Sequence, residues 1–211
     1  MTKRIIAASA NAHKIKEIKA IAKKFGMDVV SRDEAGVPPF EIVEDGQTFE
    51  ENSYKKAFAI MQASGETTIA DDSGLMVDYL GGAPGVYSAR FAGDHCDDER
   101  NNQKLLGMLE GLADSERTAK FVSVITMIFP DGQTLVARGE CPGRIIEMAT
   151  GENGFGYDPL FVPDGCDKTF AMAELDEEEK NAISHRARAL QKLEELLSER
   201  EKLLQERNRR L

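Results

Sequence analysis

The apolar and polar positions at the start of the chain predict a strand, a helix and a second strand. Residues 5–8 form a short apolar run, which indicates a buried strand. Apolar residues then recur at helical spacing from Ile15 to Phe25, and Gly26 follows as a helix stop. Apolar character resumes over residues 27–30. A strand, a helix and a strand in this order favour a parallel pair in an α/β sheet.

The rest of the chain continues this mixture of elements. The pattern predicts helices over residues 48–63, 97–112 and 178–208, and strands over residues 67–70, 75–80, 121–129 and 134–141. Thr48 and Glu51 stand in the positions of a capping box. In the second of these helices we expect Leu105, Leu106, Met108 and Leu109 to face inward. The last two strands flank the turn residues 130–133 as a hairpin, which makes the sheet mixed.

Composition narrows the class of protein. The 211 residues include 37 Asp and Glu against 27 Lys and Arg, a formal net charge of -10. This acidic balance argues against a protein that binds nucleic acid passively, but a small anionic ligand could still be held by local lysines or a metal. The longest nearly apolar run, residues 121–129, is far shorter than the roughly 18 residues that span a bilayer. The length suggests a single domain. The three cysteines are widely separated and form no disulfide framework, so we expect the protein to be cytoplasmic: Cys96, Cys141 and Cys166.

The first candidate site lies between the first strand and the first helix. A helix N-terminus offers unpaired N–H groups and the positive end of a dipole, so anions bind there. Lys14 adds a positive charge, although the segment has no glycine and is neither a P-loop nor a dinucleotide fingerprint. An ordinary capped turn is the alternative interpretation. The segment is Ser9, Ala10, Asn11, Ala12, His13 and Lys14.

Acidic residues mark a second candidate site. Asp71 and Asp72 follow a short predicted strand, at the edge where α/β sheets bind ligands. Adjacent carboxylates on a strand point to opposite faces, and acids near a polyphosphate require a divalent cation such as Mg²⁺ between them. Glu44 precedes the helix that carries Lys56, and it could reach such a metal. The alternatives are a simple Asx turn at the aspartates and a solvated helix face at Glu50, Glu51, Lys55 and Lys56.

Two later segments have the chemistry of a base pocket. Residues 154–159 read Gly-Phe-Gly-Tyr-Asp-Pro, a loop that lets backbone approach a ligand while a ring stacks on a base. Lys180 and Ser184 share a helix face, and His185 and Arg186 lie beside them. An arginine fork matches the O6 and N7 acceptors of a 6-oxopurine and would be left unpaired by adenine. A tight turn and a charged helix face are the alternatives.

Together, these segments resemble the Ham1/RdgB-like family of inosine/xanthosine triphosphate pyrophosphatases from residue 5 to about residue 197. Each segment alone is weak, and their order and spacing make the match specific. The segments that carry the resemblance are Ser9-x-Asn11-x-x-Lys14-x-x-Glu17, Phe49-x-Glu51-Asn52-x-x-x-Lys56-Ala57, Ala70-Asp71-Asp72-Ser73-Gly74-Leu75, Gly81-Gly82-Ala83-Pro84-Gly85, Gly154-Phe155-Gly156-Tyr157-Asp158-Pro159 and Glu179-Lys180-Asn181-Ala182-Ile183-Ser184-His185-Arg186.

The resemblance implies an elongated α/β fold, with a long mixed sheet and two lobes framing a nucleotide cleft, usually in a homodimer. It implies hydrolysis of ITP, dITP and XTP to the monophosphate and pyrophosphate, which cleanses the nucleotide pool. Residues Ser9 to Lys14 would hold the triphosphate, Glu44 and Asp72 would bind Mg²⁺, and Asp72 would also activate water. Lys56 would steady phosphate charge and Ser73 would contact substrate. The base pocket would comprise Phe155, Gly156, Tyr157, Asp158, Lys180, His185 and Arg186.

Alternatives to this function remain at this stage. A Maf-like pyrophosphatase has a related fold, but Ser184-His185-Arg186 argues against it. A nucleotide sensor without catalysis would bind and not turn over, although Asp72, Lys56 and Glu44 are all present. Residues 198–211 run past the resemblance. A leucine recurs every seven residues near this end, which could form an apolar face for a partner helix: Leu190, Leu197, Leu204 and Leu211. Arg200 and Arg207 interrupt that face, so we expect a frayed, solvated helix end.

Overall fold

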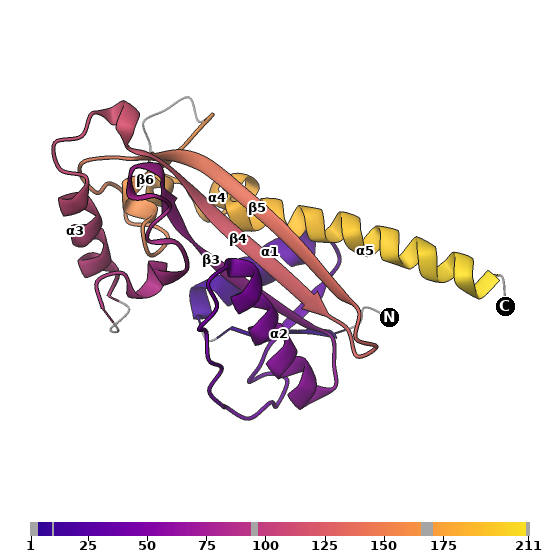
Figure 1. The fold of residues 1–211 in the computed structure, drawn as a ribbon. Coiled ribbons are helices and arrows are strands. Elements are labelled where there is room, and N and C mark those ends of the chain that lie inside the picture. Colours follow the sequence, from indigo (N-terminus) through magenta and orange to yellow (C-terminus); the bar gives the residue numbers. More distant parts are fainter. Residues whose placement is uncertain (1–3, 10, 94–96, 166–170, 210–211) are drawn as a thin grey trace. The chain divides into compact units, whose positions relative to one another are not determined.

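The fold is a mixed six-stranded sheet with helices against it, seen here in a computed structural model that describes residues 4–9, 11–93, 97–165 and 171–209 (Figure 1). The strand order is β2-β1-β3-β4-β5-β6. The strands are β1 (Arg4–Ala7), β2 (Asp28–Ser31), β3 (Thr68–Val77), β4 (Thr118–Ile128), β5 (Thr134–Ile145) and β6 (Phe161–Pro163). The α-helices are α1 (Ala12–Lys24), α2 (Phe49–Ser64), α3 (Asp98–Met108), α4 (Glu177–Ile183) and α5 (His185–Arg209).

The sheet combines parallel and antiparallel pairs, as the sequence predicts. β1 pairs in parallel with β2 and with β3, which confirms the β-α-β opening. β5 and β6 are antiparallel, and β4 and β5 are neighbours joined by the short connection 129–133. The described residues divide into two compact units. The first unit holds Met1–Asp72, Val124–Gly139 and Arg186–Leu211, and the second holds Ser73–Ser123 and Glu140–His185.

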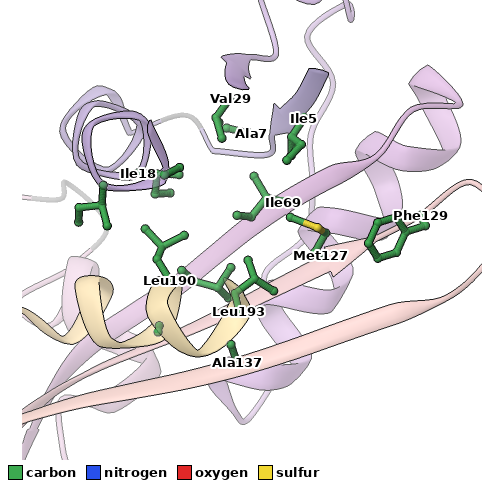
Figure 2. Close-up of a cluster of buried hydrophobic side chains, with 14 residues drawn as sticks. Ile5, Ala7, Ile18, Val29, Ile69, Met127, Phe129, Ala137, Leu190 and Leu193 are labelled. Carbon is green, nitrogen blue, oxygen red and sulfur yellow. The ribbon is translucent and has the colours of Figure 1, made fainter. Parts of the chain in front are cut away.

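The first unit has a core on each face of its strands. Alternate residues of β1 enter different cores, because successive side chains on a strand point to opposite faces. Ile5 and Ala7 pack with α1 and α5, in the cluster drawn in Figure 2. Ile6 packs with Ala57 and Ile60 of α2 on the other face. This alternation places α1 and α5 on one face of the strands and α2 on the opposite face.

The second unit has a core of its own. Leu75 and Val77 from β3 pack there with Leu105 of α3, with Leu109, the residue that caps α3, and with Phe161. Leu105 and Leu109 are fully buried and Leu106 is partly buried, as predicted. The inward position predicted for Met108 is wrong, because its side chain is 46% exposed. Met108 is the last residue of α3, one turn beyond Leu105, where the helix no longer covers it.

Two predicted element boundaries are wrong at places where ion pairs override local preference. The short strand predicted to end before Asp71 continues as β3 through residue 77, so the Asx turn is excluded. The single long helix predicted from residue 178 is broken at Ser184, whose backbone is extended with φ -63° and ψ 157°. Cations satisfy the aspartates inside the strand, and the break lets Lys180 and Arg186 bind different acids.

The N-terminus of α2 follows the predicted chemistry closely. Thr48 accepts a hydrogen bond from Glu51 N at 3.1 Å, and Gly65 ends the helix in the left-handed conformation. The second half of the capping box is shifted by one residue. Glu51 Oε2 accepts from Gln47 N at 2.7 Å and thereby reaches one peptide beyond the expected Thr48 N–H.

Candidate functional site

The N-terminus of α1 is capped by a side chain from the turn that precedes it, and whether it binds an anion stays a prediction. Asn11 caps α1, because its Oδ1 accepts from Lys14 N at 3.1 Å. Ser9 Oγ accepts from Asn11 N at 3.2 Å. Ala12 and His13 are exposed in the first turn, so their backbone is open to a ligand. Ala10, also predicted to bind substrate, lies outside the described residues.

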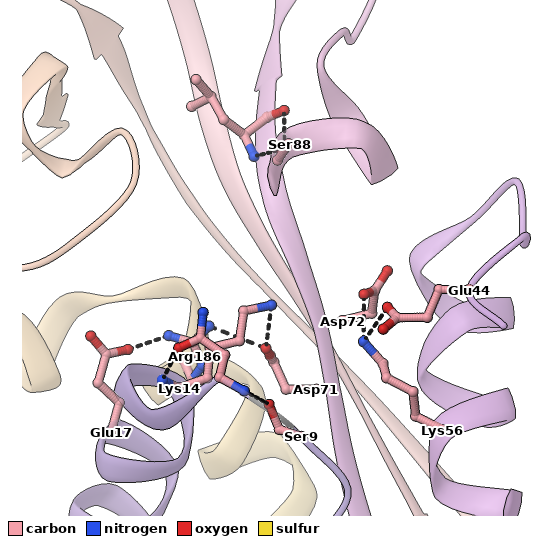
Figure 3. A network of polar contacts seen from close by, with 11 residues as sticks. Ser9, Lys14, Glu17, Glu44, Lys56, Asp71, Asp72, Ser88 and Arg186 are labelled. Atoms are coloured by element: carbon pink, nitrogen blue, oxygen red, sulfur yellow. Dashed lines mark hydrogen bonds and ion pairs between the residues drawn. The ribbon is translucent and has the colours of Figure 1, made fainter. Parts of the chain in front are cut away.

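Asp71 and Asp72 point to opposite faces of β3, as the strand geometry predicts (Figure 3). Asp71 belongs to the α1 and α5 face. Its Oδ2 lies 3.3 Å from Lys14 Nζ and accepts from Arg186 Nη2 at 3.1 Å. The other nitrogen of the Arg186 fork, Nη1, forms an ion pair with Glu17. Two cations and two carboxylates therefore form a buried network whose charges balance.

This network fixes the protonation of its cations in different ways. Burial lowers the pKa of Lys14, helped by the positive charges of Lys56 and Arg186, and the carboxylates of Asp71 and Asp72 do not offset this. Burial also opposes the charge of Arg186, but Asp71 and Glu17 outweigh it and raise the Arg186 pKa. Lys14 is thus a buried ammonium without full compensation. An anionic ligand at the α1 N-terminus would stabilise its charged form.

Lys56 joins two carboxylates on the opposite face of β3. Its Nζ donates to Asp72 Oδ1 at 2.7 Å and to Glu44 Oε2 at 2.8 Å. The loop that carries Glu44 is tied to α2, since Gly46 N donates to the buried Asn52 Oδ1 at 2.8 Å. Asn52 stands one turn before Lys56, so one helix positions both the loop and the lysine. The pairing of Lys55 or Lys56 with Glu51 is not the arrangement found, because Lys55 binds Asp45 at 2.5 Å.

The charges around Lys56 are unequal. Burial alone would lower the pKa of Lys56, but Asp72 and Glu44 outweigh burial and raise it. Burial raises the pKa of Asp72, and the attraction of Lys56 does not cancel this effect. The difference arises because Lys56 has two carboxylates, whereas Asp72 shares one ammonium with Glu44. Among the described residues, nothing donates a hydrogen bond to the buried Asp72 Oδ2.

The oxygens of Glu44 and Asp72 suit the Mg²⁺ ion that the sequence leads us to expect. Both carboxylates converge on one point, and the unpartnered Oδ2 of Asp72 is a hard ligand of the kind that Mg²⁺ prefers. Within the described residues, no group of three or more His, Cys, Asp or Glu side chains gathers as a metal cage. Mg²⁺ is commonly held by one or two carboxylates with the remaining positions left to water and phosphate, so two ligands fit.

In the second unit, Asp158 organises the predicted base loop. Asp158 Oδ2 accepts from Phe155 N at 2.9 Å and from Lys180 Nζ at 2.7 Å. The Lys180 ammonium lies 4.8 Å from the centroid of the Phe155 ring, within cation–π range. Gly154 has φ +79°, and a Cβ there would lie 2.2 Å from Asp158 Oδ2. Glycine is therefore required at this position for the loop to close on its aspartate.

The remaining predicted base-pocket residues have different surroundings. His185 is 5% exposed and its ring stacks on Phe121 at 4.9 Å with an interplanar angle of 15°. Tyr157 is buried, and its hydroxyl donates to Ser88 O at 2.9 Å. Burial, aided by the charge of Asp98, raises the Tyr157 pKa, so this hydroxyl stays a neutral donor. Half-buried Ser73 begins the second unit on β3.

Arg186 departs furthest from its expected surroundings. Its guanidinium is 1% exposed and bound to Glu17 and Asp71 within the first unit. Lys180, His185 and the loop 154–158, with which we grouped it, belong to the second unit. The role predicted for Arg186 in reading a base stays a prediction. Sequence reasoning gave no role to Glu17, although it stands one turn after Lys14 on α1, at a spacing that shares a helix face.

Comparison with known proteins agrees with this fold. A sequence model of the Ham1 family matches residues 5–196. The chain is 52% identical to a protein of Clostridium perfringens named dITP/XTP pyrophosphatase, over 92% of this chain and 97% of that protein. A protein of the same name from Bacillus subtilis is 49% identical, over 92% and 97% of the two chains.

Solved structures show the same likeness in three dimensions. The Staphylococcus aureus Ham1 protein superposes with a TM-score of 0.82 at 44% identity, covering 94% of this chain and all of that chain (100%). A Mycobacterium abscessus structure titled nucleoside-triphosphatase or dITP/XTP pyrophosphatase has a TM-score of 0.73 at 43% identity, covering 90% and 98%. These solved structures share with this chain the architecture of a mixed α/β sheet with flanking helices. The chain belongs to the Ham1 family.

Proposed function

We propose that this protein hydrolyses deaminated purine nucleoside triphosphates, namely ITP, dITP and XTP, to the monophosphate and pyrophosphate. The observation that carries the proposal is the pairing of Asp72 and Glu44 around Lys56, on the face of β3 opposite to the Asp71 network that holds Lys14. The names of the relatives supply the substrate class. The reaction consumes one water and breaks the bond between the α- and β-phosphates.

The first unit carries the groups for the triphosphate. The ammonium of Lys14 and the N–H groups in the first turn of α1 would bind the phosphates. The Asn11 cap fixes the helix end and Asp71 fixes Lys14, so both are in place before the substrate binds. Lys56 is held cationic by Asp72 and Glu44 and can neutralise charge that develops during cleavage. Glu44 and Asp72 would hold Mg²⁺, which neutralises phosphate charge and polarises water when bound.

Asp72 is the residue we assign to the attacking water. From the sequence alone, either Asp71 or Asp72 could orient the attacking water. Asp71 accepts from Arg186 and faces Lys14, with a side chain that is 0% exposed. Asp72 keeps Oδ2 without a donor among the described residues, so this oxygen is available to orient a water. Asp71 instead holds Lys14 and Arg186 in place.

The second unit carries the groups for the base. The Phe155 ring offers a stacking surface, and Lys180 stands beside it as a donor fixed by Asp158. A base with a carbonyl at position 6 can accept from such a donor, whereas the amino group of adenine cannot. We therefore assign the preference for inosine and xanthosine bases to Lys180, together with His185, which the family resemblance also implies for the base pocket.

A substrate panel tests this proposal. Purified protein with Mg²⁺ is given ITP, XTP, dITP, GTP, ATP, dTTP and CTP at equal concentration, and released pyrophosphate is measured. We expect turnover of the first three and little turnover of ATP. Binding of ITP without turnover would support the sensor, and equal rates on all seven nucleotides would exclude a base pocket with the assigned role.

Several finer expectations belong to the same proposal. None of the helices in the described part of the chain is long and apolar enough to cross a membrane. We propose that the protein acts as a homodimer, in the cytoplasm, without nucleic acid as partner. The acidic net charge of -10 supports the last point, because nucleic-acid binding requires a basic surface.

A further inference from the structure

Helix α3 holds both polar backbone groups of Gly156, in the middle of the base loop. Gly156 N donates to Asp98 Oδ2 at 2.7 Å, and Asn102 Nδ2 donates to Gly156 O at 3.0 Å. Residues four apart lie on one face of a helix. Asp98 and Asn102 therefore present an acceptor and a donor as a matched pair to a single residue of the loop.

The loop needs support from outside, because ordering its two glycines costs conformational entropy. Gly154 and Gly156 both have positive φ, +79° and +65°. Glycine adopts many conformations in the unfolded chain, so two glycines around Phe155 make this segment costly to fix. Asp158 restrains the start of the loop through Phe155 N. The hydrogen bonds from α3 restrain its centre.

α3 is itself a firmly anchored support. Leu105 and Leu109 are fully buried in the core of the second unit. Between the two residues that contact Gly156 lies Asn101, which is 3% exposed. Asn101 Oδ1 accepts from Ala92 N at 2.7 Å, and its Nδ2 donates to Ala89 O at 3.1 Å. The helix is thereby fixed by two hydrogen bonds to the segment 89–92 of its unit.

We propose that Asp98 and Asn102 are positioning residues that set base selectivity by fixing the Phe155-Gly156 segment against Lys180. They touch the loop, and the loop touches the base, so they act through Phe155 and Gly156. The inference rests on the proposed function, since it takes residues 154–158 as base-binding. The side chains assigned to the chemical step, Asp72, Lys56 and Glu44, belong to the first unit.

This arrangement predicts a particular kinetic signature. Loss of either α3 contact frees the ring of Phe155 and weakens binding of the base in the ground state and the transition state alike. Such uniform binding loss raises KM and leaves kcat at saturation unchanged. A hydrogen bond to a charged acceptor corresponds to about a tenfold change in KM. A general loss of structure would lower kcat as well.

The test compares Asp98→Ala and Asn102→Ala with matched controls on the same helix. Glu99→Ala removes the neighbouring first-turn acid, and Gln103→Ala removes an exposed amide whose Nε2 donates to Glu99 Oε1 at 3.2 Å. KM and kcat are measured for ITP and ATP with each variant. We expect KM for ITP to rise about tenfold in both α3 variants, with kcat retained and the ITP to ATP preference reduced. The controls should match the wild type.

A conservative variant keeps the test decisive if Asp98→Ala fails to fold. Asp98→Asn keeps an acceptor for Gly156 N and loses only the charge, so its KM should lie between those of the wild type and Asn102→Ala. Unchanged KM and unchanged base preference in Asn102→Ala and Asp98→Asn would overturn the inference while the wild type still turns over ITP. Absence of ITP turnover by the wild type would overturn the proposed function, and this inference with it.

Discussion

Asp71 and Asp72 are neighbours on β3, yet their carboxylates bind different cations on opposite faces of the strand. Asp71 accepts from Arg186 of α5 at 3.1 Å, and Asp72 accepts from Lys56 of α2 at 2.7 Å. The two-residue period of a strand produces this division. Asp71 pairs with Lys14 and Arg186, whereas nothing among the described residues donates a hydrogen bond to Asp72 Oδ2, the oxygen to which we assign the attacking water.

The first prediction concerns this division of roles. Asp72→Asn keeps the size of the side chain and removes the charge that orients water and binds metal. We expect kcat for ITP to fall by about 10² to 10⁴, the range for a lost acid–base group, while ITP still binds. Asp45→Asn, at an exposed aspartate paired with Lys55, is the matched control. Turnover near the wild-type rate in Asp72→Asn would remove this residue from the mechanism.

A second prediction follows from the raised pKa of Asp72. Burial shifts this pKa above the ordinary 3.8, so the native carboxyl takes up a proton more readily than the unfolded one. In metal-free protein its ionised form therefore costs stability as pH rises through the folded pKa. Activity requires the ionised form, so kcat/KM should fall at acid pH with a midpoint above 3.8 at limiting Mg²⁺.

Metal concentration provides the control for that pH dependence. Mg²⁺ and the proton compete for the same oxygen, so saturating Mg²⁺ should move the acid midpoint to lower pH. The kcat/KM profile is measured at several free Mg²⁺ levels. If the acid midpoint of the kcat/KM profile does not change with Mg²⁺ concentration, or if activity persists in excess chelator, the metal-binding role of Asp72 and Glu44 is contradicted.

The third prediction separates two roles for Arg186. Its removal leaves Glu17 and Asp71 buried with too few cations, which should cost about 3–5 kcal/mol of folding stability. Arg207→Ala, at an exposed position of α5, should stay within about 0.5 kcal/mol of the wild type. Urea unfolding measures both. If Arg186 also reads the base, the folded Arg186→Ala variant should show a smaller ratio of kcat/KM for ITP to kcat/KM for ATP than the wild type. An unchanged ratio would mean that Arg186 acts only as a structural cation.

The fourth prediction concerns the helix beyond the family match. Residues 198–209 are helical, as the predicted span to residue 208 implies, and most of them are exposed, as expected of a solvated helix end. Arg200 ties this helix to the β4–β5 turn, because it bonds Gln133 and Asp131 at 2.6 and 2.9 Å and lies 3.7 Å from the Phe129 ring centroid. Arg200→Ala should cost about 1 kcal/mol by urea unfolding. A value equal to that of Arg207→Ala would show that the contact contributes nothing.

Sequence reasoning reached the parts of the molecule that local patterns determine. The β-α-β opening, the Thr48 cap and the hairpin follow from apolar period and cap chemistry, and the structure confirms them. Sequence reasoning also gave Lys56, Glu44 and Asp72 roles toward phosphate and Mg²⁺, although only through the resemblance to a family. Residue types alone left a solvated helix face equally open.

Long-range ion pairs and loop supports were beyond the reach of local pattern. Nothing in the sequence around Asp71 signals that Arg186, 115 residues away, lets the strand continue through two acids. The break at Ser184 has no glycine or proline to mark it. Asp98 and Asn102 look like an ordinary helix start, because their partner Gly156 lies 58 and 54 residues distant.

The position of the bond that breaks tests the account most directly. ITP is incubated with the protein and Mg²⁺, and the nucleotide products are separated by chromatography while pyrophosphate and phosphate are measured. The account predicts IMP and pyrophosphate in equal amounts, with no IDP at any time. IDP with inorganic phosphate would contradict it, because the groups around Asp72 would then act on the terminal phosphate.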